Sequence, residues 1–231
     1  MDSTPFPIRP IARIRSAFPS KFGIPRQSGL APSLRAKIVF EPEFAVPEAV
    51  RGLADFSHIW LIWGFSECVR EEWSPTVRPP RLGGNIRMGV FATRSPFRPN
   101  SLGLSSVELL SVETDKNGAP VLFIAGADLM DGTPIYDIKP YLTTTDCHPE
   151  ARTGFVNPNE SYTLQVEIPE KLLGKLSDNE RDSLVEVLAQ DPRPAYQHQN
   201  EKIYGFPFSH YEIKFFVADQ IVHVTDILDE K

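Results

Sequence analysis

Five arginines lie between Trp73 and Val107, a stretch that contains no Asp, Glu or Lys although the 231-residue chain has a net charge of −6. They are Arg78, Arg81, Arg87, Arg94 and Arg98. Guanidinium groups without neighbouring carboxylates repel one another, and they match the oxygens of phosphate and carboxylate ligands. Glycines in the same stretch let the backbone approach a ligand, and prolines stiffen it. The pattern predicts an anion-binding loop; the alternative is a solvated basic loop whose arginines pair with distant acidic residues.

A second basic stretch covers residues 3–40, which hold seven Arg or Lys residues and again no acid. Basic charge is thus segregated within an acidic chain. A basic face of this kind attracts anions over a long range, so RNA and a phosphorylated metabolite are both predicted ligand classes.

The composition, 41% hydrophobic and 23% charged, is typical of a soluble globular protein with one large domain or two smaller ones. No run approaches the roughly 20 apolar residues that span a bilayer, and the first residues lack the apolar core of a secretory signal. We therefore expect a cytoplasmic protein without membrane contact. Cys68, Cys147 and the five scattered histidines show no metal-ligand spacing, so no metal site is predicted.

Short alternating or apolar runs dominate the first two thirds of the chain and predict β-strands. These runs are residues 8–15, 36–40, 57–65, 88–93, 104–114 and 121–127. Residues 115–118 include an Asn-Gly pair, which predicts a hairpin between the last two strands. A short helix is expected at residues 47–53, because Pro47 favours a first helical turn. Strands joined by proline-rich loops predict a mainly β fold, either a barrel or a sandwich.

A smaller second unit follows a linker at residues 146–161. It is predicted to have a strand at 162–168, a helix at about 178–190 with Leu184, Val185, Leu188 and Ala189 on one apolar stripe, and a closing hairpin of 210–217 and 221–227. A unit of about 70 residues is near the lower limit of independent folding, so we expect it to lean on the first domain. The predicted organisation is a β-barrel domain at 6–147, a linker at 148–160 and a small α+β C-terminal domain at 161–231.

Several longer motifs occur in order along the chain: FGIPRQSGL, FSHIWLIW, RPPRLGG, MGVFATRSPFRPNSLGLS, DLMDGTPIYDIKPY and DPRPAY. In these motifs the chain resembles the TrmO (YaeB, TsaA-like) tRNA methyltransferases, over the β-rich domain and into the second. The resemblance implies a TsaA-like β-barrel enzyme, a homodimer, that uses S-adenosylmethionine to methylate N6 of threonylcarbamoyladenosine at position 37 of threonine tRNA. The sequence contains no Gly-rich strand–turn–helix unit of the Rossmann type.

The resemblance also implies which residues surround the cofactor. They are Pro25, Arg26, Gln27, Ser66, Glu67, Arg94, Leu104, Asp131, Gly132, Thr133 and Pro134. Ser66 and Glu67 stand where the family often has His-Gln. The residue types suit the ligand, because Arg pairs with a methionine carboxylate, Asp with an ammonium and Gln with an adenine edge. Without the resemblance, Asp131 and Gly132 are typical of an ordinary turn.

Methyl transfer from a sulfonium requires alignment of the reactants and exclusion of water rather than a nucleophilic residue. Asp131, Asp137 and a backbone carbonyl are the candidates for drawing the proton off N6. Contacts with tRNA are expected from Arg78, Arg81, Arg87, Arg98, Lys139, Arg193 and Tyr196. In DPRPAY a guanidinium and an aromatic ring lie close together, as in sites that pack on an exposed nucleotide. Tyr136 and Tyr141 are further candidates for stacking on the base.

Other interpretations stay open at the level of the sequence. His58, Trp60 and Trp63 are expected in a core or an interface rather than in the chemistry. The charge pattern also fits a non-catalytic RNA- or anion-binding module, and a methyltransferase for a small metabolite is a third hypothesis. The PRQ, ATRSP and DGTP motifs favour the tRNA methyltransferase, because a simple anion binder does not need all three.

Overall fold

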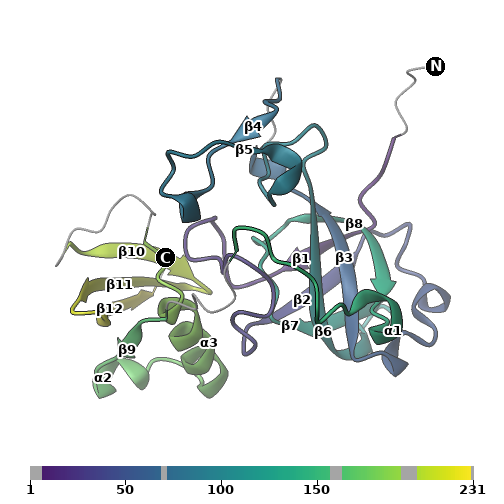
Figure 1. Ribbon diagram of the computed structural model, residues 1–231. Coiled ribbons are helices and arrows are strands. Elements are labelled where there is room, and N and C mark those ends of the chain that lie inside the picture. The colour runs from purple at the N-terminus through teal and green to yellow at the C-terminus, as the bar shows by residue number, and fades with distance from the viewer. Residues whose placement is uncertain (1–6, 69–71, 157–162, 194–201, 230–231) are drawn as a thin grey trace.

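The computed structural model describes residues 7–68, 72–156, 163–193 and 202–229, which form two units side by side (Figure 1). The first unit is a closed barrel, and the second is a four-stranded sheet with two helices. This confirms the predicted β-barrel domain followed by a small α+β domain. Among the described residues, no helix has the length and apolar character that crossing a membrane requires.

Six antiparallel strands close the barrel in the order β1-β2-β7-β6-β3-β8. They are β1 (Ala12–Arg15), β2 (Arg35–Phe40), β3 (His58–Gly64), β6 (Leu102–Thr114), β7 (Pro120–Ala125) and β8 (Pro134–Pro140), and the short helix α1 (Thr143–Asp146) follows β8. Closure comes from the pairing of β1 with β8, where Ala12 lies opposite Ile135. The sequence pattern does not predict β8, because Pro134 and Pro140 at its ends are typical of loops.

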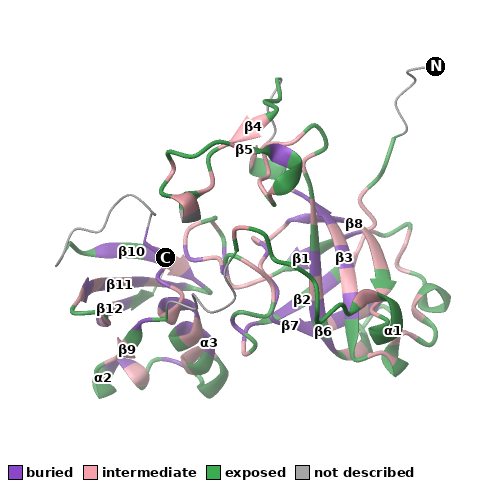
Figure 2. Cartoon of the chain, viewed as in Figure 1, coloured by how far each residue is buried: buried purple, intermediate pink, exposed green. Residues whose placement is uncertain are grey.

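Residues of the barrel strands alternate in burial, as in β2 and β7, and Figure 2 colours the buried ones purple. Ile14, Ile38, Leu61, Leu122 and Ile124 all have 0% exposure. The side chains of so narrow a barrel fill its interior. A ligand site must therefore be built outside, from segments that leave the ends of the strands.

The predicted hairpin between β6 and β7 is confirmed. Asp115 Oδ1 accepts hydrogen bonds from the backbone N–H groups of Asn117 at 2.8 Å and Ala119 at 2.9 Å. The N–H groups of Ala119 and Asn117 lower the pKa of Asp115, because they stabilise its charged form. Gly118 supplies the positive φ of 85° that the turn needs.

An arm, defined here as residues 72–101, extends from the barrel between β3 and β6 (Figure 1). It contains a ribbon of β4 (Thr76–Val77) and β5 (Met88–Gly89) and 3-10 turns at Pro80–Leu82 and Val90–Ala92. The predicted strand at 88–93 is wrong after Gly89, because Thr93 N–H and Oγ1 both bond back to Val90 O. The predicted helix at 47–53 is also different: it consists of two 3-10 turns, Pro47–Val50 and Leu53–Asp55.

The C-terminal unit packs α2 (Glu170–Leu173) and α3 (Asp178–Ala189) against a sheet in the order β10-β11-β12-β9. Its strands are β9 (Gln165–Glu167), β10 (Tyr204–Phe208), β11 (Tyr211–Ala218) and β12 (Ile221–Asp229). Strands β11 and β12 confirm the predicted closing hairpin. The sequence pattern does not predict β10; it is an edge strand, a position that tolerates its Pro207.

Helix α3 begins at a capping box in which Ser177 N–H and Oγ both bond to the Glu180 carboxylate. The buried face of the helix carries Leu184, Val187 and Leu188. The predicted apolar stripe is therefore wrong at Val185, which is 39% exposed. Val187 takes that place because residues three and four apart share one helix face.

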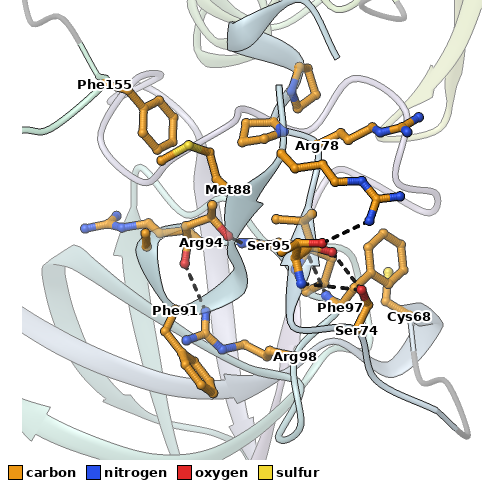
Figure 3. Close-up of a pocket in the computed structure, with 18 of the residues that line it drawn as sticks. Cys68, Ser74, Arg78, Met88, Phe91, Arg94, Ser95, Phe97, Arg98 and Phe155 are labelled. Atoms are coloured by element: carbon orange, nitrogen blue, oxygen red, sulfur yellow. Dashed lines mark hydrogen bonds between the residues drawn. The ribbon is translucent and has the colours of Figure 1, made fainter. Parts of the chain in front are cut away.

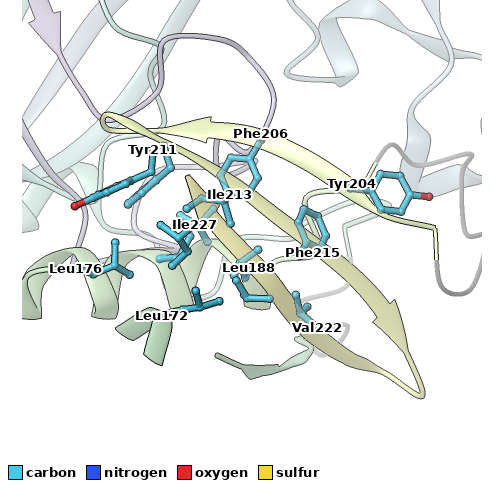
Figure 4. Close-up of a cluster of buried hydrophobic side chains, with 14 of the residues drawn as sticks. Leu172, Leu176, Leu188, Tyr204, Phe206, Tyr211, Ile213, Phe215, Val222 and Ile227 are labelled. Atoms are coloured by element: carbon cyan, nitrogen blue, oxygen red, sulfur yellow. The ribbon is translucent and has the colours of Figure 1, made fainter. Parts of the chain in front are cut away.

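The hydrophobic core of the C-terminal unit, whose centre is shown in Figure 4, also contains side chains from the first domain. Phe18, Ala31 and Leu34 come from the loop between β1 and β2 and belong to the same cluster as Phe206. The ring of Phe18 packs edge-on against Phe208 with a centroid distance of 5.8 Å. The two units thus share one core, and the second packs against the first as expected.

Alanine substitutions of Leu188 and Val185 compare the stability contributed by the buried face of α3 with that contributed by its exposed face. Leu188→Ala is expected to lower the free energy of unfolding by about 2–5 kcal/mol, because it leaves a cavity in the shared core. Val185→Ala should change it by less than about 0.5 kcal/mol, because Val185 lies on the exposed face of the helix and leaves no cavity in the core. Urea unfolding followed by circular dichroism measures both, and equal losses would contradict this assignment of faces.

Candidate functional site

Two hollows meet at the loop between β1 and β2. The inner pocket, of about 780 Å³, lies at the mouth of the barrel between this loop, the end of β3 and the start of β6. The outer cleft, of about 1730 Å³, lies along the arm and extends to residues 153–156, within the predicted linker, and to Arg193. Arg26, Gln27 and Arg94 line both hollows, so ligands in the two would lie next to each other.

The inner pocket brings together eight of the residues predicted to bind a cofactor. They are Pro25, Arg26, Gln27, Ser66, Glu67, Arg94, Leu104 and Thr133. Asp131, Gly132 and Pro134 do not line it. The volume falls in the range of roughly 300–1,000 Å³ that is usual for small-molecule sites. Segments far apart in sequence therefore converge on one pocket of suitable size.

Arg94 joins the arm to the β1–β2 loop across the pocket. Its Nη1 donates a hydrogen bond to Oε1 of Gln27, and Nε2 of Gln27 donates to the backbone oxygen of Arg26. Pro25 restricts the backbone immediately before them. These contacts hold the tip of the loop in place, which reduces the entropy that a ligand must remove on binding.

Asp128 provides a largely buried carboxylate in the inner pocket, and the sequence pattern does not single it out. Its Oδ1 accepts a hydrogen bond from Ser105 Oγ at 2.7 Å, and Ser105 Oγ accepts one from Trp63 Nε1 at 3.0 Å. Burial raises the pKa of Asp128, although the Ser105 hydrogen bond and the charge of Arg94 act in the opposite direction. A carboxylate with a perturbed pKa in a pocket is a candidate functional group.

Asp131, in the same DLMDGTP motif, anchors a turn. Its carboxylate accepts hydrogen bonds from the Ser16 N–H at 3.0 Å and from Arg15 Nη1 at 3.3 Å, and its own N–H bonds to the carbonyl of Phe18. Gly132 follows with a φ of 75°. These contacts fit the turn interpretation, and they fix the start of the β1–β2 loop.

Asp137, the other predicted proton acceptor, lies on β8 and forms an ion pair with Lys139 at 3.1 Å. Both side chains are about half exposed, at 47% and 63%. Neither these two residues nor Asp131 line the inner pocket or the outer cleft. The inner pocket is instead lined by the carboxylates of Asp128 and Glu67.

Arg78, Arg87 and Arg98, which are predicted to bind tRNA, all line the outer cleft; Figure 3 labels the first and the last. Arg98 Nη1 donates to the carbonyl of Thr93 at 3.2 Å, and Arg87 Nη1 donates to Thr76 Oγ1 at 3.4 Å. Within the described ranges, no carboxylate oxygen lies within 4.0 Å of these three guanidinium groups. Their charge is available to a ligand, which argues against pairing with distant acids.

Arg193 differs from the other predicted tRNA contacts. Its Nε and Nη2 donate to the two carboxylate oxygens of Asp191 at 2.7 and 2.9 Å, and the two side chains are 6% and 7% exposed. A buried bidentate pair of this kind holds the backbone together, so this placement favours a structural contact. Tyr196 and the side chain of Arg81 lie outside the described residues.

Trp73 and Phe91 form an exposed aromatic pair on the outer cleft, which the sequence pattern does not predict. Their rings stack at a centroid distance of 6.1 Å and an angle of 28°, and the residues are 53% and 71% exposed. Bases of nucleic acids stack on aromatic faces of this kind beside arginines. The sequence held one sign of this aromatic pair: both residues lie at or within the arginine-rich stretch.

The aromatic residues of β3 differ in their surroundings. Trp63 is 7% exposed, which confirms its predicted place in the core. Trp60 Nε1 donates to Asp146 at 2.8 Å. His58 is exposed at the start of the strand, so it does not lie in the core, and its predicted place in an interface stays a prediction. In the part of the chain that the structure describes, no three His, Cys, Asp or Glu side chains are grouped as metal ligands.

The chain matches two family domains in succession. Residues 13–147 match the tRNA-methyltransferase O N-terminal domain, and residues 161–230 match the TrmO C-terminal domain. The curated tRNA (adenine(37)-N6)-methyltransferase of Escherichia coli strain K12 is 41% identical over 222 residues, which cover 93% of this chain and 94% of that protein. A Pseudomonas aeruginosa protein named putative S-adenosylmethionine-dependent methyltransferase RcsF is 41% identical over 197 residues, 82% of this chain and 83% of its own length.

A solved structure shows the same fold. The crystal structure of TrmO from Pseudomonas aeruginosa superimposes with a TM-score of 0.77 at 32% sequence identity, covering 97% of this chain and 99% of that one. Both domains therefore match relatives of one family in sequence and in structure.

Asp128→Asn is expected to change the pH dependence of stability. Because burial raises the folded-state pKa of Asp128, its contribution to stability is largest below the unfolded pKa of about 3.9 and is lost as the pH rises through the folded pKa. Asn does not ionise, so the unfolding free energy of the variant should rise relative to wild type between about pH 4 and about pH 7.5. Urea unfolding at the two pH values measures this difference.

Ser105→Ala serves as the companion variant. It removes a hydrogen bond that favours the ionised form of Asp128, so it should make the loss of stability with rising pH steeper. A difference between Asp128→Asn and wild type that is the same at both pH values would contradict a raised pKa of Asp128 in the folded protein.

Proposed function

The chain belongs to the TrmO family of tRNA methyltransferases, and on this basis we propose that it transfers a methyl group from S-adenosylmethionine to N6 of adenine 37 in tRNA. One observation carries the proposal: the relationship to a curated tRNA (adenine(37)-N6)-methyltransferase covers both domains and 93% of the chain. The inner pocket is consistent with it, because eight of the residues that the resemblance implies for the cofactor line this one pocket.

The side chains of the inner pocket fit this cofactor. The guanidinium groups of Arg26 and Arg94 suit a methionine carboxylate, and the carboxylate of Asp128 suits a methionine ammonium. A pocket with both charges matches a zwitterion better than a simple anion. When bound, the cofactor supplies a methyl group on a positively charged sulfur.

The protein's own task in this reaction is to align two reactants and to keep water away from them. Arg94 and Gln27 link the arm to the β1–β2 loop and so form the wall between the inner pocket and the outer cleft. The chain of hydrogen bonds from Trp63 through Ser105 fixes the carboxylate of Asp128. The base to be methylated would enter from the outer cleft, beside the shared wall.

We extend the proposal to threonylcarbamoyladenosine in threonine tRNA as the acceptor, to a homodimer and to a cytoplasmic enzyme. The family resemblance suggests each of these. The carboxylate of the threonyl group and the phosphates would suit the arginines of the outer cleft.

A non-catalytic anion-binding module and a methyltransferase for a small metabolite each leave part of the site unexplained. A non-catalytic anion binder has no use for Asp128, whose negative charge weakens the binding of any anion in the inner pocket. A methyltransferase for a small metabolite would not need the outer cleft, whose volume of about 1730 Å³ is more than twice that of the inner pocket.

The decisive experiment is methyl transfer from labelled S-adenosylmethionine to tRNA with and without the threonylcarbamoyl modification. We expect label only in the modified tRNA, with threonine tRNA the best acceptor, because the modification adds a carboxylate for the arginines of the cleft. Equal labelling of both pools would overturn the proposed acceptor. Cofactor binding without labelling of any tRNA would point to another substrate, and protein that does not bind the cofactor would contradict the methyltransferase.

Trp73→Ala tests the aromatic surface of the outer cleft. Loss of base stacking should weaken tRNA binding by roughly 1–3 kcal/mol, while the KM for S-adenosylmethionine stays unchanged because Trp73 lines only the outer cleft of these two hollows. Trp73→Phe keeps an aromatic face and should restore most of the affinity. Wild-type tRNA affinity in Trp73→Ala would exclude a stacking role for this residue.

A further inference from the structure

The loop between β1 and β2, residues 17–34, is built into the C-terminal unit on both sides of its tip. Phe18 lies before the tip, and Ala31 and Leu34 lie after it; all three are at most 4% exposed within the core of that unit. Pro25 and Gln27, at the tip, line the inner pocket. The residues that reach the pocket are therefore carried on a segment whose two flanks are packed by another domain.

Close packing against β10 constrains the loop just before its tip. Gly23 has a φ of 90°, and a Cβ at this position would lie only 2.4 Å from Cδ2 of Phe206. The ring of Phe22 packs edge-on against the same Phe206 at a centroid distance of 6.0 Å. Only glycine permits this approach and this backbone conformation, so the path of the chain into Pro25 depends on the position of Phe206.

Polar contacts with α3 hold the loop just after its tip. Glu186 accepts hydrogen bonds from both the N–H and the Oγ of Ser33, each at 2.8 Å, through its two carboxylate oxygens. Ser183 Oγ donates to the carbonyl of Ser33 at 2.9 Å. Helix α3 thus satisfies the backbone N–H, the carbonyl and the hydroxyl of one loop residue, and two of these bonds are strengthened by the charge of the carboxylate.

The same loop is also bonded to the barrel. Gly29 N–H donates to the carbonyl of Gly126 at 2.8 Å, and Gly126 N–H donates to the carbonyl of Leu34 at 2.9 Å. The loop therefore bridges the two units, and any shift of the C-terminal unit relative to the barrel would displace its tip.

We propose that the C-terminal domain positions the cofactor loop, and that Glu186 is the positioning residue through which it does so. This inference rests on the proposed function, since it takes the inner pocket as the site of S-adenosylmethionine. The C-terminal domain thereby sets the affinity of the barrel for the cofactor.

Glu186→Ala in the full-length protein tests the proposal. Loss of two charge-assisted hydrogen bonds should raise the Kd for S-adenosylmethionine about tenfold in calorimetry and raise its KM similarly, with kcat and the KM for tRNA little changed. Hydrogen exchange of residues 22–28 should become faster. Glu186→Gln should restore most of the affinity, because its amide can still accept from the N–H and donate to the hydroxyl of Ser33.

Asp182→Ala, at an exposed position of the same helix, is the matched control and should leave both measurements at wild-type values. Unchanged exchange and unchanged Kd in Glu186→Ala would overturn the proposal. If that variant does not fold, Ser33→Ala replaces it, with a smaller rise in Kd expected and the same criteria. Wild-type protein that does not bind S-adenosylmethionine would instead contradict the proposed function, and the exchange measurement would still report on the loop.

Discussion

The narrow closed barrel is the constraint on which the rest of the structure depends. Its inward-facing side chains are fully buried, so a ligand has to bind on segments that leave the ends of the strands. The β1–β2 loop and the arm are those segments, and both need support. The loop receives it from the core of the C-terminal unit, and the arm receives it from the β4–β5 ribbon and from the bond between Arg94 and Gln27.

This support has an energetic consequence for binding. Five prolines within the arm restrict its backbone before any ligand arrives, and Gly23 fixes the approach of the loop to Phe206. A site ordered in advance loses less entropy when it binds its ligand. The arginines of the arm are accordingly held near one another at some electrostatic cost, which an anionic ligand would relieve.

The sequence predicts the strands whose burial alternates, such as β2 and β12, because alternation is a local pattern. It does not predict β8 and β10, whose prolines suit strand ends or an edge and therefore look like loop. The buried pair of Asp191 and Arg193 is also beyond a sequence argument, since only the fold shows that both side chains are covered. Six of the residues predicted to bind the cofactor, Pro25, Arg26, Gln27, Arg94, Leu104 and Thr133, come from three of the motifs and line one pocket, a convergence that only the fold shows.

The two hollows differ in charge in a way that the composition of the chain conceals. The described lining of the outer cleft has six arginines and one carboxylate, Glu72, and one of the six, Arg193, is already paired. The described lining of the inner pocket has four cations, Lys21, Arg26, Arg94 and Arg98, and two carboxylates, Glu67 and Asp128; its three arginines also line the outer cleft. A surface dominated by cations suits a polyanion such as tRNA, whereas opposite charges in one small pocket suit a zwitterion. The negative charge of Asp128 therefore distinguishes the inner pocket, because it disfavours the binding of phosphate there. Arg94 lines both hollows and would lie beside both ligands.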